Sequence, residues 1–218
     1  MNEIYKIIKE DLSNNKFPEN LTKNSFKTLF SYSQKNRLVS RMVSKIDKEN
    51  LYKIIPDIPF KKYHFLFKTR YLELVKEIFD INKLLKKNNI EPIFLKGAYF
   101  YLIGIQNPED RYMADIDILI KRDMIEKTIK ILLDNGYSFK RFKNFESFYI
   151  NHDWTHQTPV IITPNGYVID IHHRVTSPRK IKGECALTKI IFEQLEYVDA
   201  YNSHFAIPKP EHCICHLA

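Results

Sequence analysis

Glycine and cysteine are scarce in this chain, with five glycines and three cysteines among 218 residues. Neither G-x-G-x-x-G nor G-x-x-x-x-G-K-[ST] occurs, which excludes the usual Rossmann and P-loop phosphate-binding motifs. Three cysteines are too few for a disulfide framework and indicate a reducing compartment. No run of 18 apolar residues is present, and the first residues lack the apolar core of a signal peptide. We therefore expect a cytoplasmic protein with no membrane contact.

Acidic residues are outnumbered, since 34 Lys and Arg stand against 26 Asp and Glu, giving a net charge of +8. Such a surplus suits polyanionic ligands such as nucleoside triphosphates, RNA or DNA. A composition rich in Lys, Asn and Ile produces the same surplus with no ligand, and no RNA-binding or helix-turn-helix motif is present. A basic RNA- or DNA-binding protein is therefore one alternative reading. Hydrophobic residues make up 44% of the chain, enough for a folded core.

Helical and strand-like patterns alternate along the chain and predict an α/β (α+β) fold with a mixed sheet flanked by helices. Residues 1–60 are expected to form an N-terminal helical region, and residues 61–218 the main domain. The predicted helices cover 61–88, 98–102, 124–135 and 184–194, with Asp123 as the N-cap of the third and the start of another at 211–218. The predicted strands cover 90–95, 113–120, 137–139, 160–163, 167–172 and 196–201, with a hairpin at Asn165-Gly166 and a turn at 207–210.

Carboxylates stand at alternate positions in two of these strands. Asp115 and Asp117 share one face of the first strand, because side chains alternate between faces along a strand. Asp170 and His172 share a face of the second. Like charges this close are unfavourable unless a cation lies between them, and Mg²⁺ prefers carboxylate and phosphate oxygens. The alternative for the first pair is an exposed strand start with two solvated acids.

A strand, the pair Lys96-Gly97 and then a helix follow one another before the acidic strand. A helix start presents unpaired N–H groups, and a glycine there allows the backbone to approach a phosphate closely. Lys96 would add a full positive charge at the same place. The alternative is an ordinary turn from strand to helix.

Together these segments resemble the DNA polymerase β-like nucleotidyltransferase superfamily, and within it the bacterial group described as uncharacterised nucleotidyltransferases. The segments that carry the resemblance are Leu95-Lys96-Gly97-Ala98, Arg111-x-x-x-Asp115-Ile116-Asp117 and Val168-Ile169-Asp170-Ile171-His172-His173. The resemblance implies a mixed sheet of the nucleotidyltransferase type. It also implies an enzyme that moves a nucleoside monophosphate from a triphosphate to a hydroxyl or phosphate acceptor and releases pyrophosphate.

The resemblance further implies a role for each matching residue. The catalytic and metal-binding residues would be Asp115, Asp117 and Asp170. The nucleotide-binding residues would be Lys96, Gly97, Ala98, Arg111 and His172. The implied metal is Mg²⁺, with Mn²⁺ as the alternative, and the implied partners are a nucleoside triphosphate and an acceptor that is a small molecule, a peptide or protein, or a tRNA. The role of Arg111 stays open, because it could pair instead with Asp110 or with one of the carboxylates above.

The chain departs from the superfamily pattern at three places. Ala98 follows Gly97 where a serine or glycine is usual, which removes a hydroxyl that could contact a phosphate. His173 stands where relatives commonly carry a tryptophan. The C-terminal helix is expected to be incomplete. A catalytically inactive member that acts as a binding or regulatory protein is therefore the second alternative, although all three carboxylates are retained.

Overall fold

The computed structural model describes residues 22–35, 38–45, 59–105, 111–141, 155–177 and 185–217. The chain separates into two compact units, one comprising Met1–Glu73 with Gln106–Tyr112 and the other Leu74–Ile105 with Met113–Ala218. Helix α5 (Phe60–Lys87) contributes residues to both units. The predicted domain boundary at residue 60 stays a prediction.

The first unit is helical in its described part, as predicted. Helix α2 (Lys23–Lys35) begins after Thr22, whose hydroxyl accepts a hydrogen bond from the Ser25 N–H at 3.2 Å. This is the ordinary way to satisfy one of the free N–H groups of a first helical turn. Helix α3 (Val39–Lys45) packs against α2 and buries Met42. The aromatic rings in mutual contact in this unit include Phe26, Phe30, Phe60 and Tyr63.

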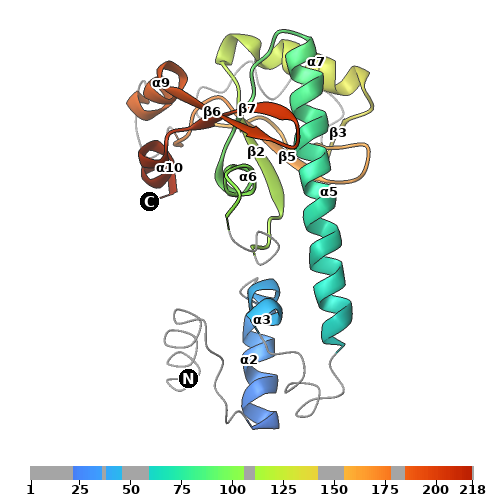
Figure 1. Ribbon diagram of the computed structural model, residues 1–218. Helices are drawn as coiled ribbons and strands as arrows, with labels where there is room; N and C mark the ends of the chain where they lie inside the picture. Colours follow the sequence, from blue (N-terminus) through green and yellow to red (C-terminus); the bar gives the residue numbers. More distant parts are fainter. Residues whose placement is uncertain are drawn as a thin grey trace. The chain divides into compact units, whose positions relative to one another are not determined.

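The second unit is built around a seven-stranded mixed sheet in the order β3-β4-β5-β2-β1-β7-β6, confirming the predicted α/β fold (Figure 1). The strands are β1 (Ile93–Phe94), β2 (Asp115–Leu119), β3 (Ser138–Phe139), β4 (Ile161–Ile162), β5 (Val168–His172), β6 (Leu195–Ala200) and β7 (Ser203–Pro208). The central pair β2–β5 is parallel and so is β1–β7, whereas the other neighbours are antiparallel. The Asn165-Gly166 hairpin is present as predicted, with Gly166 at a positive φ of 87°.

Helices connect and flank these strands. They are α6 (Lys96–Leu102), α7 (Ile125–Asp134), α9 (Ala186–Glu193) and α10 (Pro210–Leu217), with a short 3-10 turn η2 (Arg122–Met124) before α7. Helix α6 contacts β2 and β7, and α9 contacts α10. Helix α5 is tied to the sheet because Asn82 Nδ2 and Lys86 Nζ both donate to the carbonyl of His204 at the start of β7. None of the described helices is both long enough and apolar enough to cross a lipid bilayer.

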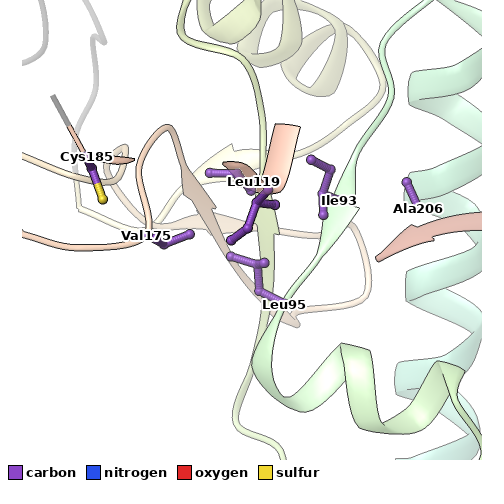
Figure 2. Packing of buried hydrophobic residues seen from close by; sticks show 7 residues of the cluster. Ile93, Leu95, Leu119, Val175, Cys185 and Ala206 are labelled. Carbon is purple, nitrogen blue, oxygen red and sulfur yellow. The ribbon is translucent and has the colours of Figure 1, made fainter. Parts of the chain in front are cut away.

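One face of the central strands changes from apolar to acidic along its length. Leu119 pairs with Ile93 on one side and His172 on the other, and strand partners share a face. Leu119 and Ile93 belong to a buried apolar cluster (Figure 2), to which α9 contributes Ile191. Two residues earlier on β2 the same face carries Asp117. The cluster comprises Ile93, Leu95, Leu119, Val175, Cys185, Ile191 and Ala206. The apolar packing therefore extends to the edge of the acidic positions and desolvates them.

The predicted turn at 207–210 is wrong, because Ser203–Pro208 forms β7 and lies between β1 and β6 in the sheet. The preceding hairpin turn uses Tyr201 and Asn202 at positive φ of 52° and 58°. Glycine is the usual residue for such a turn, so its absence hid the hairpin in the sequence.

The predicted N-cap at Asp123 is also wrong. Asp123 lies inside the turn η2, and α7 starts at Ile125 after Met124, which makes no side-chain capping bond. The predicted end of this helix is confirmed, since Gly136 has a φ of 85° and the Tyr137 N–H returns to the Leu132 carbonyl.

Candidate functional site

The parallel pairing of β2 with β5 brings two predicted carboxylates together. The register places Asp117 directly opposite Asp170, and both side chains project from the same face of the sheet. Asp115 lies two residues earlier on this face, opposite Val168. Asp117 and Asp170 are 53 positions apart in the chain, and the pairing of β2 with β5 brings them together.

Asp117 is the most enclosed member of the group, with 2% of its surface exposed. Its Oδ1 accepts hydrogen bonds from Lys96 Nζ at 2.5 Å and from His172 Nε2 at 2.8 Å. Burial alone raises the pKa of this carboxyl, but the hydrogen bond from His172 and the charge and hydrogen bond of Lys96 outweigh it, so the pKa is lowered. Asp117 is therefore held as a carboxylate in an apolar setting.

Asp170 has the opposite character. Burial and then the negative charges of Asp117 and Asp115 raise the pKa of its carboxyl, with His172 and Lys96 opposing this only in part. Its Oδ1 is buried and makes no hydrogen bond to any described residue, and the same holds for the Nδ1 of His172. A buried polar atom left without a hydrogen bond costs about 1–3 kcal/mol of folding free energy, so these two atoms destabilise the metal-free protein.

A divalent cation fits these residues. One ligand atom each from Asp117, Asp170 and His172 lies within 4.8 Å of the others, close enough to be shared by one ion. An ion here would satisfy the unpaired oxygen of Asp170 and offset the repulsion between the carboxylates. Asp115 is not a member of this closest group, although its charge reaches Asp170.

The Lys96-Gly97 junction starts α6 beside this face. Lys96 has a positive φ of 47°, an uncommon conformation for a residue with a side chain. The space where a side chain on Gly97 would start is filled by Met113, with Sδ at 2.5 Å and Cγ at 2.7 Å from an added Cβ. Ala98 is fully buried, backbone and methyl group alike, so its role toward a nucleotide stays a prediction.

Arg111 lies in the first of the two units, in the segment Gln106–Tyr112, and is exposed. The acidic face belongs to the second unit, and the role of Arg111 toward a nucleotide stays a prediction. Its alternative partner Asp110 lies outside the described residues.

Comparison with known proteins identifies the family. A family model described as "Uncharacterised nucleotidyltransferase" matches residues 22–218, most of the chain. This protein belongs to the uncharacterised nucleotidyltransferase family. A search of curated proteins found no match. Among solved structures it is similar to a Thermotoga maritima crystal structure described as "a putative nucleotidyltransferase", with 16% identity, a TM-score of 0.44, and coverage of 66% of this chain and 83% of that chain.

Two contacts in this member of the family were not predicted from its sequence. Lys96 and His172 were both expected to bind the nucleotide, and in the structure both side chains form hydrogen bonds with Asp117. The alternation of β5 already placed His172 on the acidic face, but its partner depends on the pairing of β5 with β2. His156 also lies close, since its ring centroid is 5.6 Å from that of His172.

His173, which directly follows β5, is expected to make the stability of the protein sensitive to acid. Burial, together with the charges of Arg122 and Arg174, lowers the pKa of its imidazole to about 4 from 6.5, and a backbone hydrogen bond at Thr155 opposes this only in part. Between these two values the unfolded chain binds a proton that the folded protein does not. The free energy of unfolding should therefore fall, by up to about 3 kcal/mol, as the pH drops through this window.

Urea unfolding at a series of pH values across this window, on the wild type and on His173→Gln, measures the effect. The variant should lose stability less steeply between pH 6.5 and about 4, because it has no imidazole to protonate at this position. Parallel curves for the two proteins would show that the acid sensitivity comes from other groups.

The side chain of Met113 packs so closely against Gly97 that no larger residue fits at this position without a shift. In Gly97→Ala the new methyl group must displace Met113, which is 4% exposed and lies two residues before the start of β2. We expect the free energy of unfolding to fall by about 1–3 kcal/mol, as for other overpacked sites. In a Met113→Ala background the same substitution should cost clearly less, because the conflicting side chain is gone. Equal costs in the two backgrounds, measured by urea unfolding, would rule out this packing conflict.

Proposed function

We propose that this protein is a metal-dependent nucleotidyltransferase that moves a nucleoside monophosphate from a nucleoside triphosphate to a hydroxyl or phosphate acceptor and releases pyrophosphate. The observation that carries the proposal is the pairing of Asp117 with Asp170 on one face of the sheet, with Asp170 Oδ1 buried and unpaired. Carboxylates are forced together in this way where a cation is to be bound, and family membership supports the reaction class.

Asp117 and Asp170 would hold Mg²⁺ or Mn²⁺, with Asp115 and His172 as the neighbouring donors. Carboxylate oxygens suit both ions, and a histidine nitrogen favours Mn²⁺ over Mg²⁺. A bound divalent cation supplies Lewis acidity at the α-phosphate and lowers the pKa of the attacking hydroxyl. The hydrogen bond from His172 Nε2 fixes the orientation of the Asp117 carboxylate.

Lys96 would bind the triphosphate. Its side chain is 36% exposed, so the ammonium group can be reached from solvent while it still contacts Asp117. A phosphate oxygen beside it would form a charge-assisted hydrogen bond. Gly97 and Ala98, which the resemblance also assigns to nucleotide binding, follow Lys96 at the start of α6 and are buried in this structure. Arg111 would add a further positive charge on the pyrophosphate.

Asp170 would accept the proton of the acceptor. Its carboxylate lies opposite Asp117 and close enough to share an ion with it, so it would lie beside an acceptor hydroxyl that the ion polarises. In the proposed step the acceptor oxygen bonds to the α-phosphorus as its proton passes to Asp170. The bond from the α-phosphorus to the bridging oxygen breaks, and pyrophosphate leaves with the electron pair.

Incubation of the pure protein with each α-³²P-labelled triphosphate, a cell extract and Mg²⁺ or Mn²⁺ tests the proposal. We expect label on an acceptor only with metal present, and no label from the γ-³²P forms, because the β- and γ-phosphates leave as pyrophosphate. Calorimetry of triphosphate binding with and without metal provides the binding measurement.

The alternatives give different results in the same experiments. Metal-dependent triphosphate binding without label transfer would indicate an inactive, regulatory member. RNA or DNA binding with a steep salt dependence and no triphosphate binding would favour a nucleic-acid-binding protein. Absence of any metal-dependent triphosphate binding would overturn the proposal.

A further inference from the structure

The ammonium group of Lys96 lies where a cation bound to Asp117 would compete with it. Lys96 Nζ is 2.5 Å from Asp117 Oδ1, and the same oxygen receives the hydrogen bond of His172. Asp117 and Asp170 are also the carboxylates whose oxygens lie close enough to share an ion. One buried carboxylate therefore belongs both to an internal ion pair and to the candidate metal site.

We propose that Lys96 is an internal counter-cation that competes with the divalent metal for Asp117 and leaves it when a triphosphate arrives. This inference rests on the proposed function and adds to it the order in which the ligands favour each other's binding. Metal alone binds weakly, and metal and triphosphate favour each other. In the metal-free protein Lys96 neutralises the charge of Asp117, and the site binds divalent cations only weakly until the nucleotide is present.

The burial of Asp117 explains why an internal cation is needed. Its side chain is 3% exposed, and a carboxylate removed from water to this extent is costly unless a positive charge compensates it. An ammonium group and a divalent cation on the same carboxylate repel each other, and in a partly buried site this repulsion is much stronger than in water. Binding of the metal therefore favours departure of Lys96.

The side chain of Lys96 is suited to leaving. It is 36% exposed, whereas Asp117 and His172 are almost completely enclosed, so Lys96 reaches the site from the solvent side. Its four-carbon stem allows the ammonium group to move while the backbone stays in place. The positive φ of 47° at Lys96 shows that the backbone accepts an unfavourable conformation at the residue that makes this contact.

A triphosphate supplies the new partner. Its negative charges attract the ammonium group away from Asp117, and the carboxylate that is released then becomes available to the metal. A permanently structural ion pair would behave differently, because neither ligand would change the affinity for the other through Lys96. By linkage, the factor by which nucleotide tightens metal binding equals the factor by which metal tightens nucleotide binding.

The test uses Mn²⁺ as the metal probe, followed by its paramagnetic resonance signal, and α,β-methylene-ATP as a triphosphate that cannot react. We expect Lys96→Met to bind Mn²⁺ alone about tenfold more tightly than the wild type, because a competing charge has been removed. The same variant should bind the nucleotide about tenfold more weakly in the presence of Mn²⁺, and the coupling between the two ligands should shrink. No activity measurement is needed.

Three further variants control the result. Lys121→Met removes one positive charge from an exposed position just after β2 and should leave both affinities unchanged. Lys96→Arg keeps the charge and should bind Mn²⁺ alone as weakly as the wild type does. Lys96→Gln should repeat the result of Lys96→Met and replaces it if the methionine variant does not fold, as judged by circular dichroism.

The outcomes separate this inference from the function on which it rests. If the wild type binds no Mn²⁺ even with nucleotide present, the proposed function fails. If the wild type binds both ligands but the neutral variants bind Mn²⁺ no more tightly than it does, Lys96 does not compete with metal and only this inference is overturned.

Discussion

Replacement of Asp117 by asparagine is expected to lower the proposed nucleotidyl transfer by roughly three orders of magnitude. The variant lacks the buried carboxylate of the proposed metal site, which would cost several kcal/mol of transition-state stabilisation. The variant keeps the size of the side chain but leaves the ammonium group of Lys96 without a charged partner. We also expect the free energy of unfolding to fall by about 1–2 kcal/mol, less than for a fully buried pair because Lys96 is partly exposed.

Label transfer from the α-³²P triphosphate and urea unfolding measure the two effects. Asp123→Asn is a matched control, since Asp123 is an exposed aspartate in the turn before α7. The control should behave as the wild type in both measurements. Activity within a factor of about ten in Asp117→Asn would exclude Asp117 as a metal ligand in the proposed reaction, since that loss corresponds to only about 1.4 kcal/mol.

Replacement of Asp170 by asparagine is expected to abolish transfer to a similar extent but to stabilise the metal-free protein. Asp170 carries a raised pKa because it is buried and faces Asp117 and Asp115, so at neutral pH its charge opposes folding. Removal of that charge should raise the free energy of unfolding by roughly 1 kcal/mol, a size common when a functional residue is replaced by one that suits the fold better.

Thermal unfolding with and without Mg²⁺ distinguishes this explanation from a general change in stability. Saturating Mg²⁺ with triphosphate should raise the melting temperature of the wild type, because ligands that bind only the folded state stabilise it. The Asp170→Asn protein should start from a higher melting temperature and gain little from the ligands. A variant less stable than the wild type in chelator would contradict the inferred repulsion at this site.

The opposite expected effects on stability follow from the different surroundings of two carboxylates that face each other. Asp117 has an ammonium group and an imidazole on one oxygen, and Asp170 has an unpaired oxygen. Both residues were identified in the sequence by the same alternating pattern. The pattern gave no indication of which carboxylate is stabilised and which is strained, because that depends on residues from other elements.

Much of the fold could be predicted from local patterns. The helix predicted at 61–88, the alternation in β2 and β5 and the Asn165-Gly166 turn each depend on neighbouring residues, and all three are present in the structure. β7 was missed because its hairpin turn lacks glycine and its end carries prolines that are typical of a loop. Its place between β1 and β6 comes from burial of Phe205 and Ala206 in the sheet, which is a tertiary effect.

The sequence by itself determined the spacing that puts Asp115 and Asp117 on one face and Asp170 and His172 on another. Only the tertiary structure decided that these are the same face, because the parallel register of β2 and β5 is set by long-range pairing. The contact of Lys96 with Asp117 is of the same kind, since it joins a helix start to a strand 21 residues away. Local residue preferences fix which side chains share a face, whereas hydrogen bonds and burial between distant segments fix which faces meet.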